Sequence, residues 1–171
     1  MTWRWLGIIV TAAAVGCGGQ HASSVDFEPV PPALAAEMEA SVRAFARAVA
    51  DDLSHSGPAG WRAHFADSPA FFIAADGELV FPTIEAATSA VDDLTRTTRR
   101  IVFRWGEPMR VDAVAAGLAV LAVPYSETRI DIDGRRIEES GYFTGLAEHR
   151  NDRWRLRNAH WSVAGHSQAS P

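Results

Sequence analysis

The feature that most constrains the fold of this chain is a run of strand-like segments that fills its second half. From Ile101 onward, apolar segments rich in β-branched and aromatic residues alternate with short polar turns. Asp133-Gly134 and Asn151-Asp152 are residue pairs typical of tight β-hairpin turns. Strands joined by such turns pair antiparallel, so this half predicts an antiparallel meander. The expected strands are 101–105, 109–114, 118–132, 136–149 and 154–163.

The segment before the meander is mainly helical. Apolar residues recur there at steps of three or four after Pro31-Pro32, which indicates an amphipathic helix that ends at Gly57-Pro58. Trp61 and Phe65 predict a short second helix, and Thr83 can cap a third. Asp76-Gly77 predicts a hairpin between the last two helices. Together these elements predict an α+β fold: a cone-shaped, curved antiparallel sheet with about three N-terminal helices packed on its concave face, leaving a pocket.

The N-terminus has the pattern of a lipoprotein precursor. Trp5–Val15 is an apolar run of 11 residues, which is too short to span a bilayer and suits a signal peptide. Ala14-Val15-Gly16 then precedes Cys17, the only cysteine of the chain. We therefore expect a signal peptide over 1–16, lipid attachment at Cys17 and a flexible tether over 17–32. The domain is expected over 33–165, with a disordered tail over 166–171. Gly18, which follows the cysteine, favours lipid anchoring in the cell envelope, on the outer membrane facing the periplasm.

Composition narrows the range of partners and chemistries. The formal net charge is −5, which disfavours nucleic acid as a partner. All 16 basic residues are arginine, so lysine Schiff-base chemistry is excluded. A single cysteine allows no intramolecular disulfide, and the histidines show no metal-ligand spacing. The sequence therefore predicts neither a metal site nor a cofactor.

Several motifs of the β half resemble the nuclear-transport-factor-2-like, or ketosteroid-isomerase-like, superfamily, and among its members the SnoaL-like branch and the calcium/calmodulin-kinase association domain. The motifs are Trp105-Gly106-Glu107, Tyr125-Ser126-Glu127-Thr128, Asp133-Gly134, Gly141-Tyr142-Phe143-Thr144 and 154–162 (WRLRNAHWS). The resemblance covers roughly residues 33 to 163. It implies a cone-shaped domain, a homodimer formed through the sheet and a pocket that different members use for catalysis or for binding alone. Fold alone does not fix the function.

Three residues are candidates for chemistry. Strand alternation places His160 on one face with Trp154, Leu156, Asn158 and Ser162, where it could act as a general base or merely hydrogen-bond a neighbour. Tyr125 and Glu127 share a face of the long strand, and the resemblance places Tyr125 in the pocket lining. They could supply an oxyanion donor and a base, or form a structural pair across strands.

These candidates combine into one predicted pocket. Its expected lining is Trp61, Phe65, Trp105, Tyr125, Glu127, Asn158 and His160. A few polar groups in an apolar space are the usual form of a ligand site. The leading hypothesis is therefore a domain that binds a small, largely apolar ligand. The alternatives are a lyase, isomerase or hydrolase with His160 or Glu127 as its general base, and a structural interaction module of the envelope.

Overall fold

The computed structural model describes residues 28–164, so Cys17, the expected signal peptide, most of the expected tether and the C-terminal tail lie outside the described residues. The helical elements are α1 (Pro32–Ser56), the 3₁₀ helix η1 (Gly57–His64) and α2 (Ile84–Thr97). The strands are β1 (Phe72–Ala75), β2 (Glu78–Phe81), β3 (Thr98–Trp105), β4 (Arg110–Ala115), β5 (Leu118–Asp131), β6 (Arg136–Arg150) and β7 (Arg153–Val163). The expected strands agree with β3–β7 to within a few residues.

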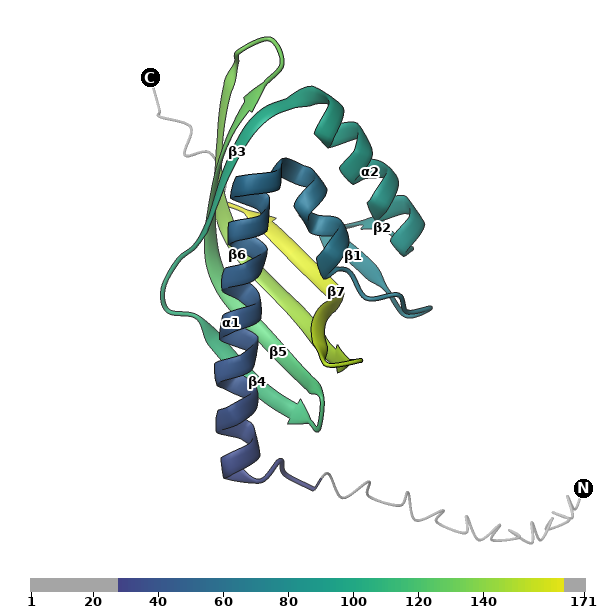
Figure 1. Ribbon diagram of the computed structural model, residues 1–171, viewed down its shortest axis with the longest axis vertical. Coiled ribbons are helices and arrows are strands. Elements are labelled where there is room, and N and C mark those ends of the chain that lie inside the picture. Colours follow the sequence, from purple (N-terminus) through teal and green to yellow (C-terminus); the bar gives the residue numbers. More distant parts are fainter. Residues whose placement is uncertain (1–27, 165–171) are drawn as a thin grey trace, which may run out of the picture.

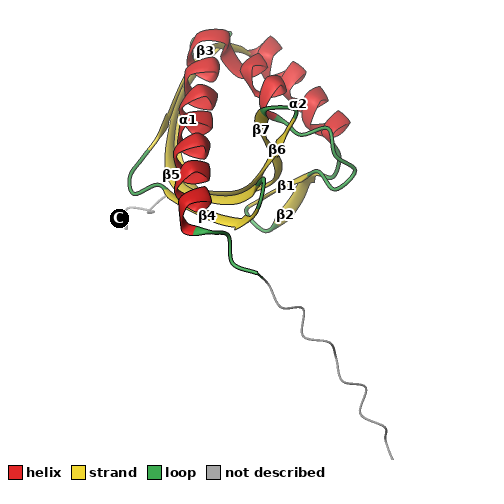
Figure 2. Cartoon of the chain, turned by 60° about the horizontal axis from the view of Figure 1, so that its bottom comes forward, coloured by secondary structure: helices red, strands yellow, loops and turns green. Residues whose placement is uncertain are grey.

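One sheet carries the whole domain, and both α-helices lie on the same side of it (Figures 1 and 2). The strand order is β2-β1-β7-β6-β5-β3, and β4 pairs with the first half of β5. We call the side under the helices the helix-covered face and the opposite side the outer face. Side chains alternate between the two faces along each strand, so Val123 and Tyr125 lie under the helices while Pro124 lies on the outer face.

The sheet differs from the expected one in two respects. It is mixed rather than antiparallel, because β1 runs parallel to β7 with Ile73 opposite Ala159. It is also not closed, since β2 and β3 form its two ends. The parallel pair arises because the hairpin at Asp76-Gly77 comes before α2 in the chain and attaches beside the last strand, which no local sequence signal reveals.

The expectation of about three helices is also corrected, because residues 28–164 form two α-helices. The segment expected to be the short second helix is η1, a 3₁₀ helix that packs directly on the last turn of α1. Gly57 has φ 69° and ends α1, a conformation that glycine adopts without steric cost. A Cβ on Gly60 would lie 2.8 Å from the Asp52 backbone, which leaves room only for a glycine at that contact.

The two helices cover different parts of the sheet. α1 begins at Pro32 and buries one face, as the apolar spacing predicts, against the sheet core. The Trp105 indole N–H donates a hydrogen bond of 2.7 Å to the Ala46 carbonyl, which fastens β3 to α1. α2 begins where Thr83 accepts a hydrogen bond from the Ala86 N–H, so this cap is confirmed. Within residues 28–164, no helix is both long and apolar enough to cross a membrane.

Candidate functional site

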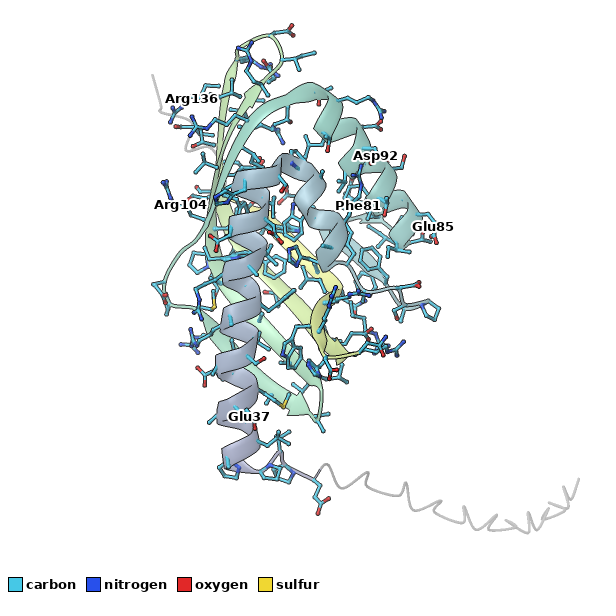
Figure 3. The ribbon with its side chains drawn as sticks, in the orientation of Figure 1. Glu37, Phe81, Glu85, Asp92, Arg104 and Arg136 are labelled. Carbon is cyan, nitrogen blue, oxygen red and sulfur yellow. The ribbon has the colours of Figure 1, made fainter. Side chains whose placement is uncertain are left out.

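A cavity of about 410 Å³ lies between the helix-covered face, η1 and α2. Its walls are mostly apolar and include Trp61 and Phe65 from η1, both expected in the pocket lining. Figure 3 shows Phe81 close to α2, whereas Arg104 and Arg136 extend on the side of the sheet away from α2. The remaining lining comes from Ile73, Ala75, Asp76, Val80, Phe81, Ala87, Ala90, Val91, Leu94, Phe103, Tyr125, Glu127, Arg129, Glu139, Leu156, Ala159, Trp161 and Val163. Its volume lies within the range of ordinary small-molecule sites.

Tyr125 and Glu139 form a hydrogen bond in the cavity lining. The Tyr125 ring is 4 % exposed, and its hydroxyl donates to Glu139 Oε1 at 2.8 Å. Burial raises the pKa of Tyr125, and the neighbouring Glu139 carboxylate raises it further. Tyr125 is therefore a neutral hydrogen-bond donor at physiological pH, and it holds Glu139 in a fixed orientation.

Glu127 on β5 lies directly opposite Glu139 on the neighbouring strand β6, because the register of these two strands pairs the two residues. Burial raises the pKa of Glu127, Arg129 lowers it and Glu139 raises it again. The Arg129 Nη1 is 3.4 Å from Glu127 Oε1, a long ion pair that offsets the burial only in part. The pair of opposed carboxylates thus includes one group that is poised to accept or release a proton nearer to neutral pH.

Gly141 makes room for the Tyr125 ring. It is the register partner of Tyr125 on β6, and a Cβ at this position would lie 2.9 Å from Tyr125 Cε1 and 1.9 Å from the Ser162 carbonyl oxygen. The ring therefore lies across the neighbouring strand where a side chain would otherwise stand. In the sequence Gly141-Tyr142-Phe143, the glycine contributes to the site through the absence of a side chain, whereas neither aromatic residue borders the cavity.

Trp161 separates the cavity from the closed core. On the cavity side its ring stands perpendicular to the rings of Tyr125 and Trp61, with centroids 4.8 Å and 5.7 Å apart. On the core side it packs against Phe143, with ring centroids 4.5 Å apart, and stacks on Trp105, with ring centroids 6.0 Å apart. Trp105, which we expected in the lining, lies behind Trp161 and does not border the cavity.

A β-bulge moves His160 and Asn158 to the outer face. On β7, Leu156 pairs with Ala147 but Asn158 pairs with Leu146, so Arg157 is an extra residue. One extra residue reverses every later side chain. Trp154 and Leu156 face the helices, and after the bulge the helix-covered positions are Ala159 and Trp161.

The residues predicted for the pocket therefore separate into two groups. Trp61, Phe65, Tyr125 and Glu127 line one cavity. His160 is exposed on the outer face and borders no part of that cavity, and the Asn158 amide donates to the Ala70 carbonyl at 2.6 Å instead. The expectation that His160 and Glu127 share a site is corrected, because the bulge sets them on opposite faces of the sheet.

The lining residues that the sequence did not predict include three charged side chains, Asp76, Arg129 and Glu139, and the large ring of Trp161. For Trp161 a signal existed, since the apolar positions of the last strand shift from Trp154 and Leu156 to Ala159, Trp161 and Val163. Glu139 required the exact register of the β5–β6 hairpin. Asp76 required the long-range pairing with β7, where its carboxylate accepts the Val163 N–H at 2.9 Å.

Other features of the described residues are less suited to chemistry. A hollow between the start of α1 and β4 is lined by small and acidic residues, and none of the described residues along it is aromatic. Between residues 28 and 164, no group of three or more histidine, cysteine or carboxylate side chains is arranged to hold a metal ion. The cavity under α2 is the candidate site.

Comparison with known proteins bears on the fold. No protein-family model matches the chain, and no curated protein matches its sequence. Solved structures do match. An NTF2-like superfamily protein from Salmonella enterica serovar Typhimurium LT2 is 13% identical with a TM-score of 0.59, over 81% of this chain and 96% of that one.

Two further matches are described as enzymes. A proposed scytalone dehydratase from Novosphingobium aromaticivorans DSM 12444 is 11% identical with a TM-score of 0.65, covering 76% of this chain and 85% of its own. A hexachlorocyclohexane dehydrochlorinase, LinA type 2, is 10% identical with a TM-score of 0.58, covering 80% and 95%. At these identities the likeness establishes the architecture alone. The chain has the fold of the NTF2-like superfamily.

Proposed function

We propose that this domain, as a SnoaL-like member of the superfamily, binds a small, largely apolar molecule in the cavity under α2. The observation that carries the proposal is the distribution of polarity in the lining. Aromatic and aliphatic side chains make most of the wall, while Tyr125, Glu127, Arg129 and Glu139 lie on neighbouring strands. Such a cavity can bury an apolar body and orient one polar group.

The experiment measures binding of N-phenyl-1-naphthylamine, a neutral fluorophore whose emission rises in apolar surroundings. We expect saturable binding to the purified protein. Ala90→Phe should abolish it, because Ala90 lines the cavity from α2 and a phenyl ring there would occupy the space. Ser89→Phe is the matched control, since Ser89 is the exposed neighbour on the same helix. Equal binding by both variants would contradict the proposal.

A second candidate function is proton abstraction by Glu127, which would make the domain a lyase, isomerase or hydrolase. The raised pKa of Glu127, in contact with an apolar cavity, favours this candidate. His160, the other candidate base, faces away from the cavity. The folds described as a dehydratase and a dehydrochlorinase are compatible with it, although fold does not determine chemistry.

The base is tested with 5-nitrobenzisoxazole, a compact aromatic probe. Removal of its C3 proton breaks the N–O bond and releases a coloured phenolate. We expect turnover above buffer that Glu127→Gln removes and His160→Gln leaves unchanged. If wild type and Glu127→Gln react at the same rate, the catalytic candidate fails while ligand binding stands. A cavity that bound neither probe would favour the third alternative, a structural interaction module of the envelope.

We also propose that the protein is lipid-anchored in the cell envelope through Cys17, on the outer membrane facing the periplasm. The support is the motif Ala14-Val15-Gly16-Cys17 after a short apolar run. Stable anchoring takes more than one acyl chain. Cys17→Ser should abolish incorporation of labelled fatty acid and move the protein out of the membrane fraction. Absence of label in the wild type would contradict the anchor.

A homodimer through the outer face is the last element of the proposal. This face exposes two large rings, Phe72 on β1 and Tyr142 on β6, and neither helix covers it (Figure 2). Apolar rings on an uncovered sheet face are typical of subunit contacts. Sedimentation at micromolar concentration should give the dimer mass, and Tyr142→Glu should give the monomer. A monomeric wild type would overturn this element.

A further inference from the structure

We propose that the ligand of this cavity is a cation, a small primary amine with an aromatic or aliphatic body. The inference rests on the proposed ligand-binding function and adds the chemical class of the ligand. It derives from two independent properties of the lining: an excess of negative charge, and aromatic rings next to that charge.

The charge excess is counted from the ionisable side chains of the lining. Three are carboxylates, Asp76, Glu127 and Glu139, and one is a guanidinium, Arg129. The cavity therefore lacks cations to match its acids. Asp76 is the least available of the three, because its carboxylate already accepts the Val163 N–H at the end of β7. The opposed pair Glu127 and Glu139 is the centre of negative potential.

The partners of this pair leave charge uncompensated. Glu139 Oε1 accepts the Tyr125 hydroxyl, which is a neutral donor. Among residues 28–164, the one ion-pair partner of Glu127 is Arg129, at a long 3.4 Å, where a close charged pair would measure about 2.7–2.9 Å. Burial raises the pKa of Glu127, and the Arg129 charge offsets this rise only in part. A ligand ammonium could donate to both carboxylates at once, since opposed residues of paired strands lie about 4.5–5.5 Å apart at Cβ.

Aromatic rings supply the second attraction. Trp61, Phe103, Tyr125 and Trp161 all line the cavity. Trp161 stands perpendicular to Tyr125 and to Trp61, so the rings present both faces and edges to the same space. The face of an aromatic ring attracts a cation, most strongly where water is excluded. The same rings accept an apolar body, so one molecule can satisfy both halves of the lining.

The test compares three probes of similar size by isothermal titration calorimetry on the purified protein at pH 7. The probes are 2-phenylethylamine, a cation; 2-phenylethanol, its neutral counterpart; and 3-phenylpropanoate, an anion. We expect the amine to bind about tenfold more tightly than the alcohol, the size of effect that a desolvated cation–π contact with carboxylate neighbours supports. The anion should bind more weakly than the alcohol.

Variants locate the preference. The double variant Glu127→Gln/Glu139→Gln should bring the amine and alcohol affinities close together. If circular dichroism shows that the double variant folds poorly, the two single variants are measured instead, and each should lose part of the preference for the amine. Glu138→Gln is the matched control, because Glu138 neighbours Glu139 on β6 but is exposed and pairs with Arg136. It should leave the tenfold preference unchanged.

The outcomes separate the two levels of the hypothesis. If the alcohol or the anion binds as tightly as the amine, the cation inference is overturned while cavity binding stands. Binding of N-phenyl-1-naphthylamine without binding of 2-phenylethylamine would likewise overturn the cation inference and leave cavity binding in place. If neither that fluorophore nor any of the three probes binds, the proposed function itself fails.

Discussion

The two ends of the helix-covered face differ in how they are filled. Under α1 the space is closed: Val42, Val49 and Leu53 are buried against the sheet. Under α2 it is open, and only Ala87 and Val91 of that helix are buried. The same sheet therefore carries a packed core under α1 and a cavity under α2, and the two helices lie over different parts of it (Figure 2).

The difference lies in the side chains that face the sheet. α1 is 25 residues long and presents Met, Val, Phe and Leu to it, which can interdigitate without leaving space. α2 is 14 residues long and presents alanines, Ala87 and Ala90, at two of its positions on the cavity. Opposite it the sheet changes from Leu121 and Val123 to Tyr125 and Glu127. Small residues on the helix and polar residues on the strand together turn a core into a site.

The largest expected effect is on the closed end. Leu53→Ala removes a fully buried side chain at the end of α1, so we expect a loss of about 2–5 kcal/mol in the free energy of unfolding. Leu94→Ala removes the same atoms from the wall of the cavity, where the side chain is only partly buried, and should cost less than about 1.5 kcal/mol.

Urea unfolding of the two variants measures this difference. Both substitutions are Leu→Ala in a helix, so helix propensity cancels in the comparison. Equal losses would mean that the space under α2 is packed in solution and that the cavity does not exist there.

The sequence predicts the closed end better than the open one. The apolar spacing of α1 and the turn signals at Asp133-Gly134 and Asn151-Asp152 are local, and the structure confirms the elements that they predict. Asn151 and Asp152 both have positive φ, as the hairpin signal requires. The number of helices and the parallel β1–β7 pair depend on long-range packing, so local patterns gave no access to them.

A smaller effect should follow from Tyr125→Phe. This change keeps the buried ring and removes the hydroxyl that donates to Glu139, and a lost hydrogen bond of this kind costs about 1 kcal/mol. Tyr142→Phe is the control, because it removes the hydroxyl of a side chain that is 42% exposed on the outer face and keeps the ring proposed for the subunit contact; its cost should stay within about 0.5 kcal/mol. Chemical denaturation measures both costs. Equal costs would mean that the hydrogen bond between Tyr125 and Glu139 does not stabilise the folded protein.

The part of the site on β5 could be predicted from the sequence, whereas the part on β7 could not, because β7 contains one inserted residue, Arg157. Tyr125 and Glu127 alternate correctly along β5, which is regular in this region. Alternation fails on β7 because Arg157 is inserted in a bulge. A bulge is set by how two strands meet, and a pattern read on one strand cannot place it. Glu139 joins the site for the same kind of reason, through the register of its partner strand.

The next expected effect is a change with pH. Because the pKa of Glu127 is raised above its ordinary value of 4.5 in the folded protein, the unfolded chain releases this proton first as the pH rises. The stability that this group contributes is therefore full below pH 4.5 and is lost as the pH rises through the folded pKa. Glu127→Gln does not titrate, so its stability relative to wild type should increase between pH 4 and pH 7.

Unfolding curves at pH 4, 5, 6 and 7 test this sign. The Arg129 contact is already included in this prediction, because its attraction for the ionised carboxylate acts on the folded pKa of Glu127. A falling difference for Glu127→Gln would mean that Glu127 is better solvated than its position in the cavity lining implies.

The smallest expected effect is that of His160→Ala. His160 is exposed on the outer face, opposite Thr144 of β6, with the bulge at Arg157 between it and the inward-facing Leu156. Substitution of an exposed strand residue away from caps and networks usually changes stability by less than about 0.5 kcal/mol. We expect that result in denaturation, together with unchanged binding of N-phenyl-1-naphthylamine. A tenfold loss of binding on His160→Ala, with stability intact, would mean that β7 pairs without the bulge in solution. That result would return His160 to the face of Tyr125 and restore a shared site, so this variant tests the register on which the contrast between the two ends of the sheet depends.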